Sequence, residues 1–296
     1  MTRLTKYSLL TIAILAVSWS AIFIRIADAD PISTAFYRMA FAVVILIPIG
    51  GRGLIKSLQK LSRLDCALII ISGIVLGLHF ASWISSLKHT TIANSVIIVS
   101  TQPFFVAVAE AVIWKTKISK GVILGMVAAF IGMILISGIG SGIGAGSLLG
   151  EFLALIGAVC AGAYLIIGRK LRQNLKNRHY ILSVYSIAAI TLLIIAGFTS
   201  APLSDFSDTT WIMFVLLALI PTVIGHSLYN YLLKYLKAHI VGLTILGEPI
   251  GAIVLAALIF GEYPAVTAVV GGALILIGIA LALFAKKSDN KRLETA

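Results

Sequence analysis

Residues 102–135, QPFFVAVAEAVIWKTKISKGVILGMVAAFIGMIL, recur in altered form 146 residues later as residues 248–281, EPIGAIVLAALIFGEYPAVTAVVGGALILIGIAL, without a gap. The matches that matter most are Pro103 with Pro249, Gly125 with Gly271 and Gly132 with Gly278. Apolar residues match easily by chance, so the proline and glycine matches carry most of the weight. The similarity extends over residues 77–284, and internal duplication of apolar segments is typical of membrane carriers.

The composition around this repeat is that of a membrane protein. Of the 296 residues, 60% are hydrophobic, and the mean hydropathy is +1.08. This is more apolar surface than the interior of a soluble chain of this length can hide. A helix needs about 20 apolar residues to cross the hydrocarbon layer. Ten spans are predicted, near residues 8–26, 32–50, 65–87, 92–114, 121–138, 148–168, 180–198, 209–233, 240–260 and 266–285.

The basic residues predict how these spans are oriented. Of the 23 Lys and Arg residues, 20 fall in the two termini or in alternate links between spans. Because Lys and Arg are retained on the cytoplasmic side during insertion, we expect both termini to be cytoplasmic, in the cell (inner) membrane. Topology and contacts with anionic membrane lipids therefore explain the net charge of +12, and no nucleic acid partner is expected.

Five predicted spans lie on each side of a glycine-rich link at residues 139–147. With an odd number of spans in each half, the second half must enter the membrane from the opposite side. The related lysines agree, since Lys88 falls on the outer side and Lys234 on the inner side. The prediction is an all-α membrane protein with ten transmembrane helices in a 5+5 inverted repeat. Its predicted parts are residues 1–140, residues 148–285 and a cytoplasmic tail at 286–296.

Short motifs in a fixed order resemble those of a known family. They are residues 19–23 and Arg25 in the first span, Pro31 and Arg38 around the second, Gln102-Pro103 in the fourth, Gly150-Glu151 and Arg169-Lys170 at the ends of the sixth, Glu248-Pro249 in the ninth, Gly261-Glu262 after it, and residues 271–278 in the tenth. No single motif is specific, but their order and spacing are. Over nearly its whole length the chain resembles the EamA-type ten-helix carriers of the drug/metabolite transporter superfamily.

That resemblance implies a solute cavity formed by spans one to four and six to nine. It also implies transport of a small organic metabolite, amino acid-like or related, commonly as export. Two antiparallel halves can expose one central site to either face in turn, so we expect a secondary transporter that works by alternating access. A membrane-embedded enzyme and a channel are the alternatives, although no H-E-x-x-H, G-x-S-x-G or Walker motif is present. Cys66 and Cys160 show neither disulfide nor metal spacing, so neither a metal nor a cofactor is expected.

Arg38 is a candidate cavity residue because a charge that faces lipid is costly. It lies about six residues below the outer edge of its predicted span, roughly 9 Å at helical rise. A cavity or structural ion-pair role is one interpretation. The other is that its long side chain reaches up to the outer head groups.

Glu248 is the candidate for ion coupling, together with His226. It lies about eight residues inside its predicted span and is followed by Pro249, which removes a backbone donor and disturbs the helix there. A carboxyl group at that depth can bind and release a proton, as a proton-coupled carrier requires. The alternative is a structural bond to His226 or to the backbone. The related position in the first half, Gln102, is neutral, so any coupling is asymmetric.

Two histidines share helix faces with aromatic residues. His79 precedes Trp83 by four residues, and His226 precedes Tyr229 and Asn230 by three and four, which places each group on one side of a helix. Such faces suit the binding of a small solute, although packed, hydrogen-bonded histidines are equally common. Further candidate cavity residues are Trp19, Tyr37, Asn94 and Tyr164.

A stripe of small residues follows the fifth predicted span. It consists of Gly121, Gly125, Ala128, Ala129 and Gly132. Small residues let helix backbones approach closely. Packing within one chain is the simpler interpretation, and a homodimer contact is the alternative.

Overall fold

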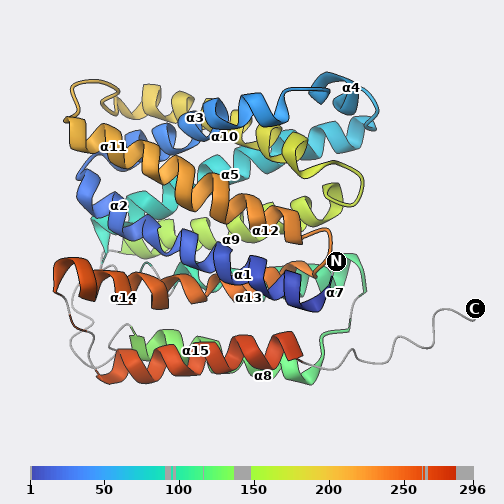
Figure 1. Ribbon diagram of the computed structural model, residues 1–296, viewed down its shortest axis with the longest axis vertical. Coiled ribbons are helices and arrows are strands. Elements are labelled where there is room, and N and C mark those ends of the chain that lie inside the picture. Colours follow the sequence, from blue (N-terminus) through green and yellow to red (C-terminus); the bar gives the residue numbers. More distant parts are fainter. Residues whose placement is uncertain are drawn as a thin grey trace, which may run out of the picture.

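The computed structural model describes residues 2–90, 95, 98–115, 117–136, 148–261, 263 and 266–284, and every regular element in them is a helix (Figure 1). The elements are α1 (Arg3–Val17), α2 (Trp19–Ala27), α3 (Pro31–Gly50), α4 (Leu54–Leu58), α5 (Arg63–His89), α7 (Gln102–Ile113), α8 (Lys120–Ile136), α9 (Leu148–Leu171), α10 (Asn177–Thr199), α11 (Asp208–Leu217), the π-helix η1 (Ala218–His226), α12 (Ser227–Leu232), α13 (Ala238–Ile245), α14 (Gly247–Phe260) and α15 (Val266–Phe284).

Seven helical segments are long and apolar enough to cross a membrane. They are Leu4–Ala27, Pro31–Gly50, Arg63–His89, Leu148–Leu171, Asn177–Thr199, Asp208–Leu232 and Ala238–Phe260. Three shorter apolar helices cover Gln102–Ile113, Lys120–Leu135 and Val269–Phe284. These segments occur where the ten spans were predicted. The main difference is in the fourth, where the described helix begins at Gln102 and most of residues 91–97 lie outside the described part.

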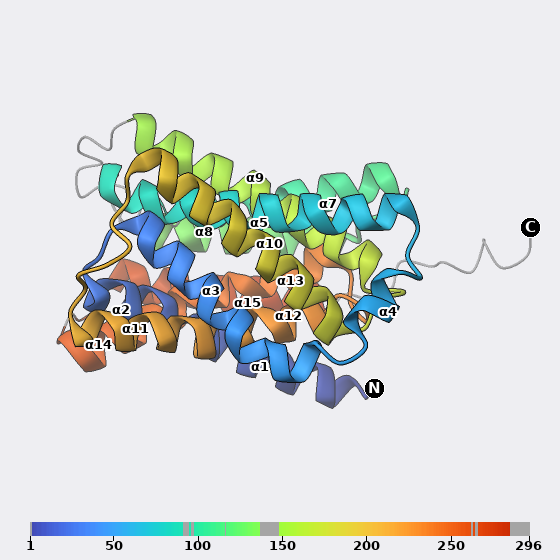
Figure 2. The same ribbon diagram turned by 90° about the horizontal axis from the view of Figure 1, so that it is seen from above.

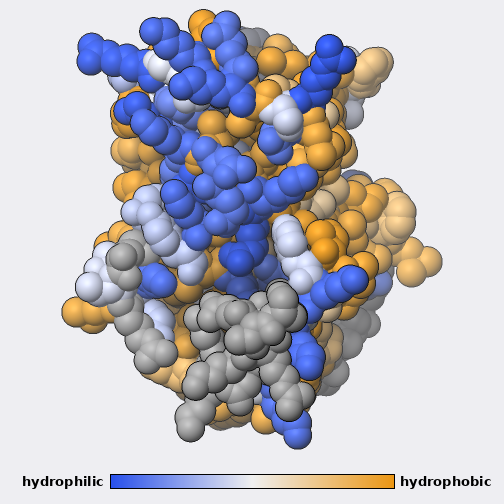
Figure 3. Space-filling model, turned by 90° about the vertical axis from the view of Figure 1, so that its right-hand side faces the viewer, coloured by the Kyte–Doolittle hydropathy of each residue, from blue (hydrophilic) through white to orange (hydrophobic). Residues whose placement is uncertain are grey.

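The surface of the molecule agrees with a membrane environment. Large apolar side chains point outward along many helices, among them Val44, Ile47, Ile70, Ile190, Ile194, Val254 and Leu258. The end of the molecule that carries α4 and the N-terminus is instead hydrophilic at its centre, with hydrophobic flanks (Figure 3). The links that follow α3, α9 and α12 lie at this same end (Figure 1). A hydrophilic end between apolar flanks is the arrangement expected of a protein that crosses a bilayer.

Helices α8 and α15 pack against each other through glycines. A Cβ atom added to Gly125 would lie 2.4 Å from the carbonyl oxygen of Gly278, and one added to Gly132 would lie 2.4 Å from that of Gly271. Only a residue without a side chain allows such close backbone contact. Since the earlier glycine of α8 meets the later glycine of α15, the two helices are antiparallel. For these glycines, packing within one chain is the interpretation that holds.

Helices α3 and α10 form a second antiparallel pair, which is seen side by side in Figure 2. At one end, a Cβ on Gly50 would meet the backbone oxygen of Arg178 at 2.7 Å. At the other end, the Ser33 hydroxyl donates to the carbonyl oxygen of Pro202 at 2.5 Å. The residues at the end of α3 thus lie against the start of α10, as antiparallel packing requires.

Three of the apolar segments are interrupted near their middle. Ser18 separates α1 from α2, Leu246 separates α13 from α14, and the π-helix η1 lies between α11 and α12. In η1 the interruption follows from Pro221, which has no backbone N–H to donate within a helix. The ninth predicted span is therefore two helices, and Glu248 lies in the first turn of α14 rather than within a continuous helix.

Candidate functional site

Arg38 lies in the middle of α3 and is completely buried. Its Nε donates a hydrogen bond to Thr222 Oγ1 at 2.7 Å. Its guanidinium carbon lies 4.3 Å from the ring centre of Phe80, within the range of a cation–π contact. The side chain therefore points into the protein and does not reach up to the outer head groups.

The π-helix η1 positions Thr222 for this contact. π-helical turns are rare and often occur at functional sites. Within η1, the Thr222 hydroxyl donates to the carbonyl oxygen of Leu217, five residues earlier, at 2.9 Å. Its oxygen remains available as the acceptor for Arg38. Thr222, which follows the proline at position 221, thus links the eighth predicted span to α3.

Several buried donors beside this contact have no partner. Among the described residues, Nη1 and Nη2 of Arg38, the hydroxyl of Tyr229 and Nε1 of Trp83 form no hydrogen bond. All three side chains are at most 9% exposed. More than about 90% of buried polar groups in proteins have a partner, so a group of unpaired donors in one region needs an explanation.

The rings of both histidines pack against Phe80. His79 forms a hydrogen bond through Nδ1 with the carbonyl oxygen of Gly157 at 2.9 Å, and it is stacked on Trp83 with ring centres 6.0 Å apart. The His226 ring meets Phe80 edge to face, with ring centres 5.6 Å apart. Each histidine also interacts electrostatically with Arg38. The structure thus brings together the histidine faces that the sequence placed on separate helices.

Glu248 is the acidic residue that interacts with Arg38, although the two side chains are not bonded to each other. It interacts electrostatically with Arg38 and with Tyr229. Within the described part of the chain, Glu248 forms neither a hydrogen bond nor an ion pair, so it is not bonded to His226. The side chain is partly exposed. The arginine on α3 and the carboxyl group on α14 therefore lie within electrostatic range of each other without forming an ion pair.

A hydrogen-bonded polar cluster adjoins the site. The side-chain amide of Asn230 donates to the hydroxyl of Tyr164 and, at 3.4 Å, to that of Tyr185. Tyr185 in turn lies 3.4 Å from the hydroxyl of Ser227. Arg38 also interacts electrostatically with Tyr185. Tyr164 and Asn230, both predicted from the sequence, are thus linked to Arg38 through one shared neighbour.

The remaining predicted residues are placed differently. Tyr37 donates to the carbonyl oxygen of Leu203 at 2.5 Å and belongs to an aromatic cluster with Trp211 and Phe214. Trp19 is stacked on Phe23 at the start of α2. Gln102 is buried at the start of α7. Asn94 lies outside the described residues.

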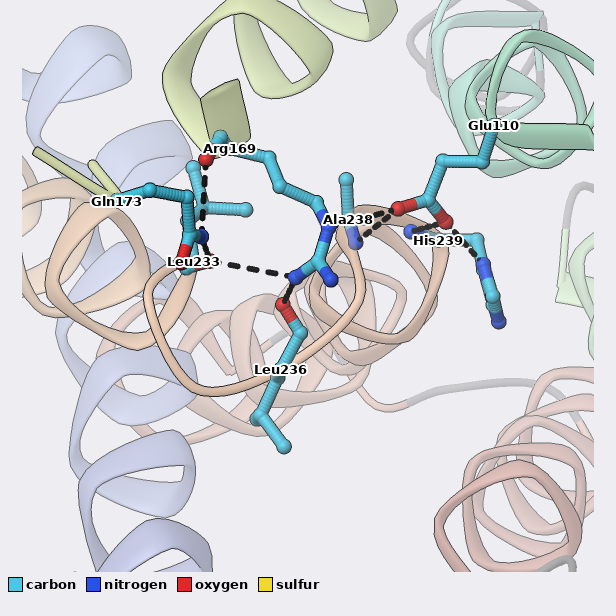
Figure 4. A network of polar contacts seen from close by, with 7 residues as sticks. All are labelled: Glu110, Arg169, Gln173, Leu233, Leu236, Ala238 and His239. Atoms are coloured by element: carbon cyan, nitrogen blue, oxygen red, sulfur yellow. Dashed lines mark hydrogen bonds and ion pairs between the residues drawn. The ribbon is translucent and has the colours of Figure 1, made fainter. Parts of the chain in front are cut away.

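The structure also contains a polar network that was not predicted, centred on Glu110 of α7 (Figure 4). One carboxylate oxygen of Glu110 accepts a hydrogen bond from the backbone N–H of Ala238 at 2.9 Å and lies 3.2 Å from Nε of Arg169. The other oxygen accepts from the backbone N–H of His239 at 3.2 Å and contacts Nδ1 of the same residue. The carboxylate therefore caps the N-terminus of α13.

Arg169 extends this network to the link between α12 and α13. Its Nη1 donates to the carbonyl oxygens of Leu233 and Leu236 (Figure 4). The network thus joins α7 of the first half to α9, α12 and α13 of the second half. Its signal in the sequence was an acidic residue within the fourth predicted span, the same criterion that identified Glu248 in the ninth.

No metal centre is formed in the part of the chain that the structure describes. Among those residues, no three His, Cys, Asp or Glu side chains come together as metal ligands. Cys66 and Cys160 are free thiols.

Comparison with known proteins places these features in a family context. A model described as the EamA-like transporter family matches twice, at residues 5–138 and 148–284. The uncharacterized transporter YyaM of Bacillus subtilis (strain 168) is 27% identical over 257 residues, which are 84% of this chain and 83% of that protein. An uncharacterized transporter of Archaeoglobus fulgidus is 26% identical over 284 residues, covering 92% of this chain and 95% of that protein.

A solved structure shares the fold. A chain described as "Crystal structure of protein" superposes with a TM-score of 0.78 and covers 95% of this chain and 97% of its own length. The two sequences are 17% identical, so this similarity concerns the fold alone.

Proposed function

Because this chain belongs to the EamA-like transporter family, we propose that it moves a small organic solute across the cell membrane by alternating access. The family match confirms the resemblance seen in the sequence and makes the protein a multi-pass membrane transporter rather than an enzyme. We propose an amino acid-like or related solute, with export as the direction and a proton as the coupling ion.

We further propose that the ten apolar segments cross the membrane as two inverted halves. The offset of 146 residues relates Gly125 to Gly271 and Gly132 to Gly278. In the α8–α15 pair, Gly125 contacts Gly278 and Gly132 contacts Gly271. Each glycine thus contacts the residue related to the other glycine. This reciprocal pattern is expected when a two-fold axis relates two copies of one element. It supports a pseudo-two-fold axis between the halves.

The observation that carries the proposed mechanism is the pair of opposite charges on different halves. Arg38 lies on α3 in the first half, and Glu248 lies on α14 in the second. They interact across the site without forming an ion pair. Because the halves move relative to each other in alternating access, such a pair changes its surroundings during the cycle. A solute or a proton that binds between them can therefore favour one arrangement over the other.

Replacing Glu248 tests the coupling. Glu248→Gln keeps the shape of the side chain but cannot carry a proton. In proteoliposomes that hold the purified protein, a solute first identified by thermal stabilisation should be taken up in a pH-dependent way by the wild-type protein. In the variant, we expect flux to fall by about tenfold or more, and the remaining flux to be independent of pH.

The matched control is Asp208→Asn, which makes the same change at an exposed position at the start of α11. This variant should retain wild-type flux and pH dependence. If Glu248→Gln behaves in the same way as the control, Glu248 has no part in coupling. Counterflow of labelled solute, which carriers show and channels do not, tests the carrier mechanism separately.

A further inference from the structure

We propose that Arg38 is the residue that binds a carboxylate group of the transported solute. The inference rests on the proposed transport function and specifies its binding site.

The first argument is the state of the guanidinium group. Arg38 is completely buried, yet its Nη1 and Nη2 atoms have no hydrogen-bond partner within the described residues. A buried charge without a partner is strongly unfavourable, and proteins normally pair such groups. The two free nitrogens of one guanidinium form a planar fork that matches the two oxygens of a carboxylate. A solute carboxylate would supply the missing partner.

The second argument is that the fork is held in place before any solute binds. Nε of Arg38 donates to Thr222, and the guanidinium carbon lies over the Phe80 ring, 4.3 Å from its centre. These two contacts leave the terminal edge of the group as its free part. A donor group that is already oriented loses little side-chain entropy when it binds its ligand.

The third argument concerns the groups around Arg38. Glu248 interacts with it electrostatically, but the two side chains form no ion pair in the described part of the chain. The other unpartnered atoms nearby include the Tyr229 hydroxyl and Nε1 of Trp83, both of which can donate hydrogen bonds. One unpartnered acceptor, Oδ1 of Asn230, lies in the adjoining cluster. The four unpartnered donor atoms of Arg38, Tyr229 and Trp83 outnumber it, which favours an acceptor-rich, anionic group as the ligand.

Helix α10, the counterpart of α3 in the second half, carries no arginine at a corresponding depth in the described chain. In α10, which pairs with α3, Arg178 and His179 lie in the first turn, and no Lys, Arg or His lies deeper. The halves therefore do not provide two equivalent anion sites.

Matched pairs of carboxylic acids and their amides test the inference. Acetate is compared with acetamide, benzoate with benzamide, and amino acids with their amides, at constant ionic strength and with thermal stabilisation of the purified full-length protein as readout. For each effective solute pair, we expect the acid to act at concentrations about tenfold or more below those of the amide. In Arg38→Gln the acid should lose this advantage, while the response to the amide is unchanged.

Two further variants keep the test informative if Arg38→Gln folds poorly. Arg38→Lys retains the charge without the planar fork, and it should retain only part of the preference for acids. Arg25→Gln is the matched control, because Arg25 also lies over an aromatic ring, Phe260, at 4.4 Å but on an exposed part of α2. Its preference for acids should equal that of the wild-type protein.

Parallel flux measurements separate this inference from the transport function. Equal responses to acid and amide in the wild-type protein, or no response to any acid, would overturn the role of Arg38 even if saturable flux is found. If the protein prefers acids through Arg38 but shows no saturable flux, the result would support the binding role of Arg38 and contradict the transport function.

Discussion

Arg38, Glu110 and Glu248 are ionisable side chains within apolar helices, and their surroundings differ. Glu110 is bonded to two backbone N–H groups, to His239 and to Arg169. Arg38 uses one of its three guanidinium nitrogens. Glu248 forms no hydrogen bond or ion pair within the described chain. A fully paired charge stabilises one arrangement of helices, whereas incompletely paired charges remain available for binding.

Glu110→Gln tests the structural role of the first of these charges. The variant loses the ion pair with Arg169 and turns an amide N–H₂ toward groups that are themselves donors. Removing one partner of a fully buried pair costs about 3–5 kcal/mol. Because the Arg169 side chain is 27% exposed, we expect a smaller loss here, about 2–3 kcal/mol.

The measurement is the apparent melting temperature of the purified protein, which should fall in Glu110→Gln. Asp205→Asn makes the same change at an exposed loop position and should leave the melting temperature unchanged. A melting temperature equal to that of the wild-type protein would show that the network in Figure 4 does not contribute to stability.

At the scale of the element, two interrupted segments contribute to the site beside the continuous helices α3 and α5. Thr222 lies in the π-helix η1, and Glu248 follows the break at Leu246. Prolines at 221 and 249 account for missing backbone donors in these segments. The uninterrupted helices α8 and α15 instead pack against each other through glycines.

Two glycines of α15 provide a test of this packing. In Gly278→Ala the new methyl group would lie 2.4 Å from the carbonyl oxygen of Gly125, so the helices must separate. Overpacking of this kind costs typically about 1–3 kcal/mol. The apparent melting temperature of the purified variant should fall accordingly.

Gly272→Ala is the matched control on the same helix. There the nearest atom, of Ile250, would lie 3.8 Å from the added Cβ, which is ordinary contact. Replacing a helical glycine by alanine is otherwise stabilising by roughly 0.5–1 kcal/mol. Equal effects of the two substitutions would contradict the close α8–α15 contact.

At the scale of the whole molecule, two antiparallel pairs join the halves. They are α3 with α10 and α8 with α15, and each pairs one helix with its counterpart in the other half. Contacts of this kind follow when two copies of one fold are related by a two-fold axis. They support the inverted arrangement that the span count and the basic residues predict.

Chemical labelling tests the inversion. In a chain whose Cys66 and Cys160 are replaced by Ser, the single substitutions Lys88→Cys and Lys234→Cys place thiols at related, exposed positions of the two halves. If the halves are inverted, a membrane-impermeant maleimide added to intact cells should label only Lys88→Cys. After the cells are permeabilised, it should label both.

Labelling of both thiols in intact cells, or of neither, would contradict the inverted arrangement. Lys6→Cys, at the N-terminus, is the control for the cytoplasmic side. It should be labelled only after permeabilisation.

Much of the fold could be predicted from single features of the sequence. Apart from the start of the fourth, the apolar segments are found where they were predicted, because the length of an apolar run depends on local composition. The prediction was wrong locally where a helix is broken. The sequence predicts a disturbance at Pro249 within one span, whereas the structure has two helices that are separated at Leu246. The π-helix around Pro221 was not predicted from the sequence. A proline in a helix interrupts its hydrogen bonds but does not determine which kind of irregular turn replaces them.

The candidate site was predicted in composition but not in arrangement. Arg38, His79, His226, Tyr229 and Glu248 were singled out as ionisable or aromatic residues within apolar segments, which sequence alone can show. Their partners were not predictable in the same way. Thr222 and Phe80 carry no signal of their own, and their role depends on the packing of η1 and α5 against α3.

The sequence by itself determined the membrane character, the position of the apolar segments, the duplication and the family resemblance, because these depend on composition and on spacing along the chain. Only the tertiary structure decided that Arg38 is buried with two free nitrogens, that Glu248 lies near it without pairing, and that Glu110 caps α13. The physical reason is that a partner is set by distance in space. Helices far apart in the 146-residue repeat become neighbours only when the halves pack.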